Sequence, residues 1–314
     1  MEVFHQLQDV AVGTRRTSVA IGNFDGLHLG HVALINQMLT HARESGAIPA
    51  VLTFFPHPVE VLRPSQPLER LTTGSEKLAL LERAGVELVL VAKFDSHLAA
   101  LSPEDFFTNY LAEGLRADSV HVGFNFRFGK GRAGDTRVLG ELCAARGIGL
   151  HVEPPVELDG VKVSSTTIRK LLAEGNVAQA ARLLGRRYSV SGQVQPGDGR
   201  GHQLGFPTAN LHCPAEKLLP MNGVYVTRAV WQKQSFLSVT NVGIRPTFQS
   251  PGAAPTRAVP AHVEVHVLDF SSRLYDEFVE LQFCERIRDE KKFDSIEALK
   301  RQIASDVATA RKAK

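Results

Sequence analysis

One stretch near the start of the sequence restricts the possible folds more than any other. Residues 22–31 read Gly-Asn-Phe-Asp-Gly-Leu-His-Leu-Gly-His and follow the short apolar run of residues 18–21. That run predicts a buried strand, and apolar residues at helical spacing from Val32 to Leu39 predict a helix to about Ser45. A strand, a glycine-rich turn and a helix start therefore surround the histidines of this stretch.

His28 and His31 are three residues apart, so they fall on one face of a first helical turn. Backbone N–H groups at a helix start favour a bound phosphate, and two imidazoles can donate to a phosphate whose charge grows in a transition state. Gly22 and Gly30 leave room for a ligand to approach the backbone. Taken alone, two histidines near a turn also fit an ordinary surface position.

Segments typical of strands and helices alternate from Thr17 to about Leu184. This alternation predicts a parallel sheet covered by helices, with ligands at the carboxyl ends of its strands. His28, His57 and Asn125 each follow an expected strand, so they could share one crevice. The strands expected after the first are residues 48–54, 86–91, 119–122 and 149–153, and helices are expected at about 73–84, from 102 onwards and at 135–146.

A second candidate for phosphate binding is the run Ser164-Ser165-Thr166, followed by Arg169. Hydroxyl residues are preferred at helix starts, and an arginine one turn further on can grip phosphate oxygens with its planar fork. Simple capping remains an alternative for the hydroxyl residues alone. A basic segment before this run fits either a solvated loop or a phosphate-facing one: Arg127, Lys130, Arg132 and Arg137.

The sequence changes character after Leu184. Val263, Val265 and Val267 alternate with more polar residues, as in a strand with one buried face, and glycine and proline punctuate several short segments of this kind, which predicts an antiparallel barrel or sandwich. The expected strands are residues 188–194, 224–231, 236–242, 261–268 and 278–283. Asp294 with Glu297 predicts the cap of a final helix through Ala308, which packs through Ile296, Leu299, Ile303 and Val307.

Composition narrows the class of protein further. The 314 residues suffice for two domains, expected at 1–184 and 185–314, and a net charge of +3 requires no nucleic acid or other polyanion as a partner. Cys143, Cys213 and Cys284 suggest neither a disulfide framework nor a zinc site. We expect neither a secretory leader nor a membrane-spanning segment. We expect a cytoplasmic enzyme with small-molecule substrates, and a homo-oligomer is possible.

Together the motifs resemble a known family. The stretch G-N-F-D-G-x-H-x-G-H, with S-S-T-x-x-R after it, resembles the signature of adenylyl-transferring enzymes with a doubly wound α/β fold. In this form it resembles the bifunctional riboflavin kinase/FAD synthetases of bacteria. Residues 197–210 resemble the glycine loop and P-T-A-N motif of riboflavin kinases, and residues 222–225 and 241–248 match further family segments. The resemblance covers roughly residues 17 to 311.

The resemblance implies both a fold and an activity. The fold is α/β plus β: an N-terminal doubly wound parallel-sheet nucleotidyltransferase domain, and a C-terminal antiparallel β-barrel riboflavin kinase domain with a C-terminal helix. The barrel would transfer the γ-phosphoryl group of ATP to riboflavin with Mg²⁺, giving FMN. The N-terminal domain would then join FMN to the AMP part of a second ATP, giving FAD and pyrophosphate.

The resemblance also assigns residues. Catalysis falls to His28 and His31 in the first domain and to Glu264, as general base, in the second. Taken alone, a glutamate on an exposed strand face also fits a merely solvated position. The ATP and phosphate ligands of the first domain are Gly22, Asn23, Phe24, Asp25, Gly30, Ser164, Ser165, Thr166 and Arg169, and its flavin ligands are His57, Asn125, Phe126 and Phe128. The ATP ligands of the kinase domain are Gly199, Gly201, Gly205, Thr208 and Asn210, of which Thr208 and Asn210 also hold Mg²⁺ through oxygen atoms.

Two departures from the family pattern and two rival functions accompany this interpretation. Tyr275-Asp276 stands where the family usually reads Tyr-Gly, and residues 249–260 form a segment rich in proline, alanine and glycine, expected to be a surface loop beside the flavin.

One rival function is that of a transferase for another phosphate ester with a passive barrel, against which P-T-A-N and Glu264 argue. The other is a non-catalytic flavin-binding protein, against which H-x-G-H and S-S-T-x-x-R argue.

Overall fold

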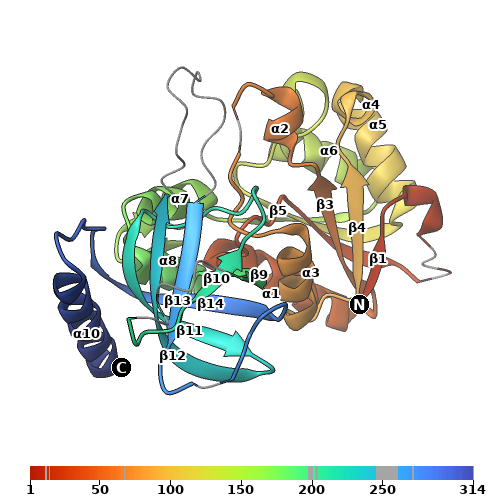
Figure 1. The fold of residues 1–314 in the computed structure, drawn as a ribbon. Coiled ribbons are helices and arrows are strands. Elements are labelled where there is room, and N and C mark those ends of the chain that lie inside the picture. Colours follow the sequence, from red (N-terminus) through yellow and green to blue (C-terminus); the bar gives the residue numbers. More distant parts are fainter. Residues whose placement is uncertain are drawn as a thin grey trace. The chain divides into compact units, whose positions relative to one another are not determined.

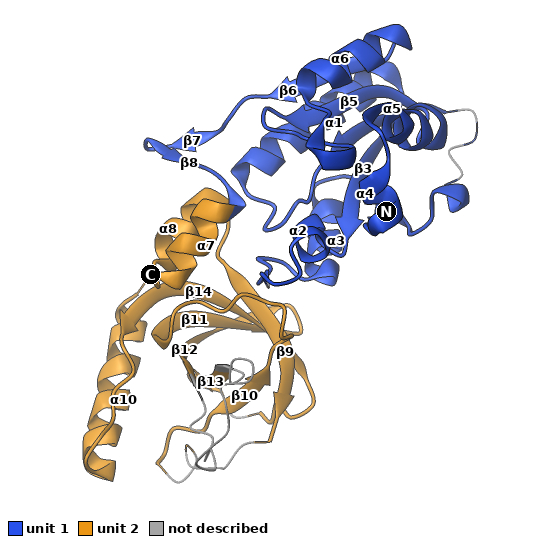
Figure 2. Cartoon of the chain, turned by 90° about the horizontal axis from the view of Figure 1, so that it is seen from above, with its two compact units in different colours: residues 1–165 blue, residues 166–314 orange. Residues whose placement is uncertain are grey.

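The chain folds into two compact units, Met1–Ser165 and Thr166–Lys314 (Figure 2). The computed structural model describes residues 1–10, 13, 15–66, 68–196, 201, 204–244, 261–270 and 272–313. The division falls before the two helices that precede the barrel, about twenty residues ahead of the boundary expected at residue 184. The assignment of functional domains to 1–184 and 185–314 stays a prediction.

The first unit is built on a parallel sheet. In the described residues it has the strand order β1-β4-β3-β2-β5-β6, and every neighbouring pair is parallel (Figure 1). The chain runs outward from β2 through β3 to β4 and then returns to β5 on the other side of β2, so the doubly wound prediction is confirmed. The strands are β1 Glu2–Phe4, β2 Thr17–Ile21, β3 Ile48–Phe55, β4 Leu88–Lys93, β5 Ala117–Gly123 and β6 Gly149–Glu153.

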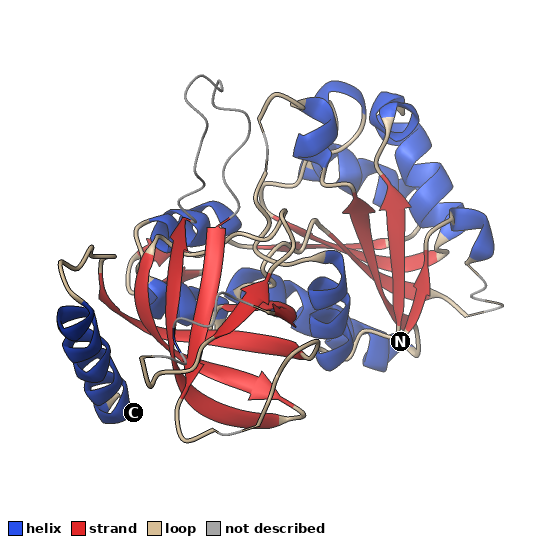
Figure 3. Ribbon diagram, viewed as in Figure 1, coloured by secondary structure: helices blue, strands red, loops and turns tan. Residues whose placement is uncertain are grey.

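Helices cover both faces of this sheet (Figure 3). Alternate strand residues supply the two cores, because successive side chains of a strand point to opposite faces. Val19 and Ile21 belong to the cluster with α4, α5 and α6, whereas Ala20 between them belongs to the cluster with α1 and α3. The helices are α1 Leu29–Ser45, α2 Pro58–Leu62, α3 Gly74–Arg83, α4 Ser96–Ala100, α5 Pro103–Phe106 with a π-helix Phe107–Gly114, and α6 Thr136–Ala145.

The second unit is a closed antiparallel barrel, as predicted. Its described strands follow the order β10-β13-β12-β11-β14-β9 around the ring. Two helices, α7 Ser165–Ala173 and α8 Val177–Leu184, precede it, and a short hairpin of β7 Glu157–Leu158 and β8 Val161–Lys162 precedes them. The barrel strands are β9 Ser189–Gln195, β10 Ala209–His212, β11 Gly223–Trp231, β12 Gln234–Ile244, β13 Ala261–Val267 and β14 Phe278–Arg288.

The final helix, α10 Ile296–Lys312, packs on the barrel through Val307, as expected, but not through Ile296. Its N-cap is Ser295, whose hydroxyl accepts from the backbone N–H of Ala298, so the prediction of Asp294 was one residue early. Ile296 is 60% exposed and does not belong to the packing face. That face is formed near the other end by Val307 and Ala310, which contact β11 and β12. Among the described residues, no helix combines the length and apolar character needed to cross a membrane.

Candidate active sites

The predicted residues of the first unit meet at one edge of its sheet. Strands β3, β2 and β5 are neighbours and parallel, so their carboxyl ends lie side by side. His57 follows β3, His28 follows β2 and Asn125 follows β5. This is the edge at which ligands bind in doubly wound sheets.

His28 is the N-cap of α1. Its Nδ1 accepts a hydrogen bond from the backbone N–H of His31 at 3.3 Å, and the two rings stack on each other. An acceptor Nδ1 in a neutral imidazole leaves the proton on Nε2, so the fold selects the tautomer that donates through Nε2. His28 is buried and His31 half-buried. The two histidines therefore have a fixed mutual geometry before any ligand arrives.

Small residues make room for this pair. A Cβ on Gly30 would lie 3.3 Å from Cε1 and Nδ1 of His28, a tight contact that would require the ring to shift by a few tenths of an ångström. Phe24 is completely buried and its ring contacts His31, while a Cβ on Gly22 would meet the ring of Phe24. The side chain of Phe24 thus supports the histidines from beneath.

Asp25 ties the glycine-rich turn to the loop before α3. Its carboxylate accepts from the backbone N–H groups of Leu71 and Thr72 and from the Thr72 hydroxyl, at 3.1 to 3.3 Å. Its backbone carbonyl accepts from the Ser165 hydroxyl at 2.8 Å. The carbonyl of Asn23 accepts from Thr53 at 3.4 Å. Asp25 therefore connects the two predicted phosphate motifs, and its carboxylate has a structural role, because it holds the loop before α3.

The serine-rich run opens a helix, as expected. Helix α7 starts at Ser165, preceded by Ser164, with Thr166 exposed and Arg169 half-buried one turn further on. Ser164 and Ser165 end the first unit, whereas Thr166 and Arg169 begin the second. The motif thus crosses the division between the two units.

The aromatic segment after β5 is only partly open to a ligand. Asn125 is exposed, Phe126 half-buried and Phe128 buried, and the two phenylalanine rings stack at 5.5 Å. Phe128 belongs to the core. The exposed ring is that of Phe124, with the ammonium of Lys162 4.7 Å from its centroid. In the nearby basic segment, Arg127 pairs with Asp135 and Arg137 with Glu141 at the surface, which favours the solvated alternative.

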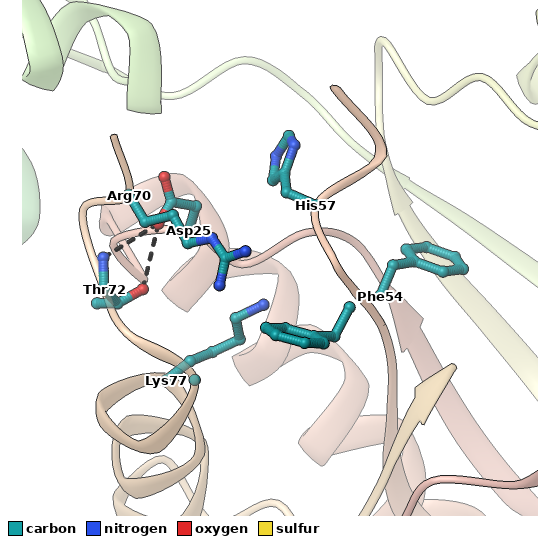
Figure 4. A pocket seen from close by; sticks show the side chains of 8 residues that line it. Asp25, Phe54, His57, Arg70, Thr72 and Lys77 are labelled. Atoms are coloured by element: carbon teal, nitrogen blue, oxygen red, sulfur yellow. Dashed lines mark hydrogen bonds between the residues drawn. The ribbon is translucent and has the colours of Figure 1, made fainter. Parts of the chain in front are cut away.

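His57 caps helix α2 and also lines a pocket. Its Nδ1 accepts from the backbone N–H of Val59, and the backbone N–H of His57 donates to the Glu60 carboxylate. The pocket also includes Arg70 and Lys77, two cations that the sequence analysis missed (Figure 4). No motif marks them, since Arg70 stands in a loop and Lys77 inside a helix.

In the barrel, two predicted site residues and one further asparagine lie side by side on three neighbouring strands. Glu264 on β13 lies directly opposite Asn210 on β10 and opposite Asn241 on β12. Side chains directly opposite on neighbouring strands share one face of the sheet. Glu264 is 42% exposed, and its Oε1 lies 3.0 Å from Nε2 of His262. The carboxylate is therefore open to a substrate and has an imidazole beside it.

The phosphate loop of the barrel is described in part. A Cβ on Gly201 would lie 2.8 Å from Oγ1 of Thr208 and 2.5 Å from the Phe206 carbonyl, so the loop approaches Thr208 at a point that only glycine allows. Gly205 is exposed in the turn before Thr208, and Thr208 and Asn210 are half-buried. Gly199 and residues 249–260 lie outside the described residues.

The fold and the two sites define a class of protein, a two-unit transferase with a nucleotidyltransferase-type sheet and a kinase-type barrel. Comparisons with known proteins identify the family within this class. Residues 11–167 match the family model of FAD synthetase, and residues 184–314 match that of riboflavin kinase. The chain belongs to the bifunctional riboflavin kinase/FMN adenylyltransferase family. It phosphorylates riboflavin to FMN and adenylylates FMN to FAD, so neither rival function holds.

Relatives with that name span nearly the whole chain. The Pseudomonas fluorescens enzyme is 37% identical over 99% of this chain and 97% of its own length. The enzyme of Escherichia coli strain K12 is 36% identical over 93% of this chain and 91% of its own. A solved structure from Streptococcus pneumoniae, titled macrolide-efflux protein, superposes with a TM-score of 0.89 at 32% identity and covers 100% of this chain and 99% of its own.

Proposed function

We propose that the two activities use separate sets of residues, one at the carboxyl edge of the parallel sheet and one on the barrel strands β10 and β13. The observation that carries this proposal is the register that sets Asn210 of the P-T-A-N motif directly opposite Glu264. A candidate phosphate ligand and a candidate base then face the same space. The histidine pair belongs to the other unit.

The first set would transfer the adenylyl group by positioning and charge. The attacking group is the FMN phosphate, which is ionised at neutral pH, so the step needs no general base. His28 and His31 would donate to the α-phosphate as its charge grows, and Ser164, Ser165 and Arg169 would hold phosphate oxygens. The backbone N–H that fixes Nδ1 of His28 supports this role, because it keeps the donating Nε2–H available.

The second set would transfer the γ-phosphoryl group to riboflavin. Glu264 would take the proton of the ribityl hydroxyl, and Thr208 and Asn210 would hold the phosphates of ATP together with Mg²⁺. A hydroxyl oxygen and an amide oxygen suit this hard cation, which prefers oxygen ligands and shares them with substrate phosphates. When bound, Mg²⁺ neutralises charge on the transferred phosphoryl group. The half-buried positions of both side chains agree with that use.

The test is chromatography of flavins after incubation of the purified chain with ATP and either riboflavin or FMN, with and without Mg²⁺. We expect riboflavin to give FMN and then FAD, FMN to give FAD directly, and chelation to stop riboflavin phosphorylation. Phosphorylation that continues with excess chelator would contradict the metal role of Thr208 and Asn210.

Two further assignments are part of the proposal. The adenylyltransferase domain would end near residue 184 and the kinase domain would begin there, which the match of the riboflavin kinase family from residue 184 supports. The enzyme would work in the cytoplasm, where its substrate ATP is available.

A further inference from the structure

The pocket beside His57 holds two cations from different parts of the chain. Arg70 comes from the loop before α3 and Lys77 from α3 itself, and both side chains reach the space faced by Phe54 and His57 (Figure 4). The pocket opens to solvent, and its empty space of about 280 Å³ includes part of that opening. The proposed roles of the histidines, serines and Glu264 leave this pair unused.

Lys77 has hydrogen-bonding capacity to spare. Within the described part of the chain its Nζ donates to Thr53 Oγ1 at 3.3 Å, although an ammonium has three donors. Burial lowers the pKa of Lys77 to about 8, against the opposing effect of the Asp25 carboxylate. Its positive charge is therefore incompletely compensated by the protein.

Arg70 also has a hydrogen-bond donor that is not used within the described residues. One terminal nitrogen donates to both oxygens of Glu60 at 2.9 and 2.6 Å, and its guanidinium lies 4.9 Å from the centroid of the Phe55 ring. Its Nε is buried and has no hydrogen-bond partner among the described residues. A buried N–H without an acceptor is costly, so an incoming oxygen would be favoured there.

The carboxylates around Arg70 and Lys77 already accept hydrogen bonds from other groups of the protein. Asp25 accepts from the backbone of Leu71 and Thr72 and from the Thr72 hydroxyl. Glu60 accepts from Arg70 and from the backbone N–H of His57. The pocket thus offers cationic donors with unused capacity, and its acidic groups face their own internal partners.

We infer that Arg70 and Lys77 form a phosphate subsite of the adenylyltransferase unit. This inference rests on the proposed function, in which both substrates of the unit carry phosphate. The group bound is a phosphate oxyanion, and its source is either the 5′-phosphate of FMN or the pyrophosphate end of ATP. The subsite holds the phosphate in place and takes no part in bond making.

The test measures FAD formation from FMN in Lys77→Met, which keeps the length of the side chain and removes the charge. The KM for one substrate should rise about 10- to 100-fold, the effect of losing a charge-assisted hydrogen bond, with a smaller change in kcat. A rise in the KM for FMN identifies the flavin phosphate, and a rise in the KM for ATP identifies the pyrophosphate end. Lys93→Met, at an exposed lysine of the same unit, should leave both values unchanged.

Unchanged KM values for both substrates in a Lys77→Met protein whose riboflavin kinase activity is intact would overturn the subsite. Failure of the proposed function is a different result, because His28→Ala would then form FAD from FMN at the wild-type rate.

A second measurement does not depend on the stability of Lys77→Met. In the wild type, the KM for the affected substrate should rise between about pH 7 and about pH 9.5, as Lys77 loses its proton. The titratable and charged groups that face this lysine are Asp25, Glu60, Arg70 and His57. Lys77→Arg stays protonated and should abolish the rise. Identical alkaline profiles for the two proteins would also overturn the subsite.

Discussion

The rings of His28 and His31 lie stacked, with their centroids 3.7 Å apart and an angle of 14° between their planes. The backbone N–H of His31 donates to Nδ1 of His28, so the first turn of α1 fixes the tautomer of one ring and the position of both. We propose that this pair stabilises charge on the α-phosphate and has no part in riboflavin phosphorylation.

His28→Ala should therefore stop FAD formation while FMN still accumulates. Loss of one preorganised donor costs on the order of 10²–10³ in rate. The variant also loses an N-cap, which costs ~0.5–2 kcal/mol of stability. His28→Asn separates the two effects, since asparagine caps a helix well but has no donor at the position of Nε2. Normal FAD synthesis by His28→Asn would reduce His28 to a capping residue.

Asp306→Asn should destabilise the second unit strongly. Asp306 is buried and accepts from Arg288 Nη2 at 2.7 Å and Nε at 3.0 Å, and also from Gln302. Breaking a buried ion pair from one side leaves an uncompensated charge and costs ~3–5 kcal/mol. The matched control is Asp289→Asn, whose carboxylate is 75% exposed and pairs with Arg286, and we expect it to lose less than ~1 kcal/mol. Denaturant unfolding of both variants measures the difference.

His121 should make the chain sensitive to acid. It is fully buried, bonds through Nε2 to the hydroxyls of Ser18 and Ser119, and stacks on His151. Burial, with smaller effects of His151 and His41, lowers its pKa to about 3. The unfolded chain takes up this proton near pH ~6.5, so stability is complete above that value and falls by ~1.4 kcal/mol per pH unit towards the folded-state pKa.

His121→Gln keeps hydrogen-bonding capacity towards the two serines and removes the titration. Its free energy of unfolding should depend less steeply on pH below about 6.5 than that of the wild type. The free energies are measured by urea unfolding at several pH values. If they depend equally on pH in the two proteins, His121 takes up its proton in the folded chain at the same pH as in the unfolded chain.

Asp276→Gly should stabilise the barrel by up to ~1 kcal/mol. Asp276 has a φ of 66°, in the left-handed region that disfavours residues with a Cβ, and its N–H donates to Val194. The turn in which the family resemblance leads us to expect glycine is thus formed here by an aspartate at positive φ. Thermal unfolding measures the effect, with Asp276→Ala as the less stable comparison. A lower melting temperature for the glycine variant would show that aspartate contributes a stabilising contact.

The sequence predicted the elements whose pattern is local. The strand, turn and helix around His28, the cap at Thr73 with Glu76, and the valine alternation of β13 each lie within a few residues, and the structure has all of them. The three-residue strand β1 and the four-residue β10 were missed, because segments so short show no periodicity. Their pairing with β4 and with β9 and β13 is decided by tertiary contacts.

The pocket of Arg70 and Lys77 could not be predicted for a related reason. It depends on Asp25 holding the backbone of Leu71 and Thr72, 46 and 47 residues away in the sequence. No local pattern records such a contact. In the sequence, Lys77 looks like an ordinary surface lysine of an amphipathic helix, whereas the fold leaves it half-buried beside the pocket.

The separation of the two chemistries is tested by flavin chromatography of two variants, alone and mixed. Glu264→Gln keeps its size but cannot accept a proton at neutral pH, so riboflavin phosphorylation should fall by ~10²–10⁴, while supplied FMN is still converted to FAD. His28→Ala should stop at FMN. Given riboflavin and ATP, neither variant alone should form FAD, but their mixture should, since FMN released by one serves the other. A mixture that forms no FAD, or near-native turnover of riboflavin by Glu264→Gln, would contradict the account.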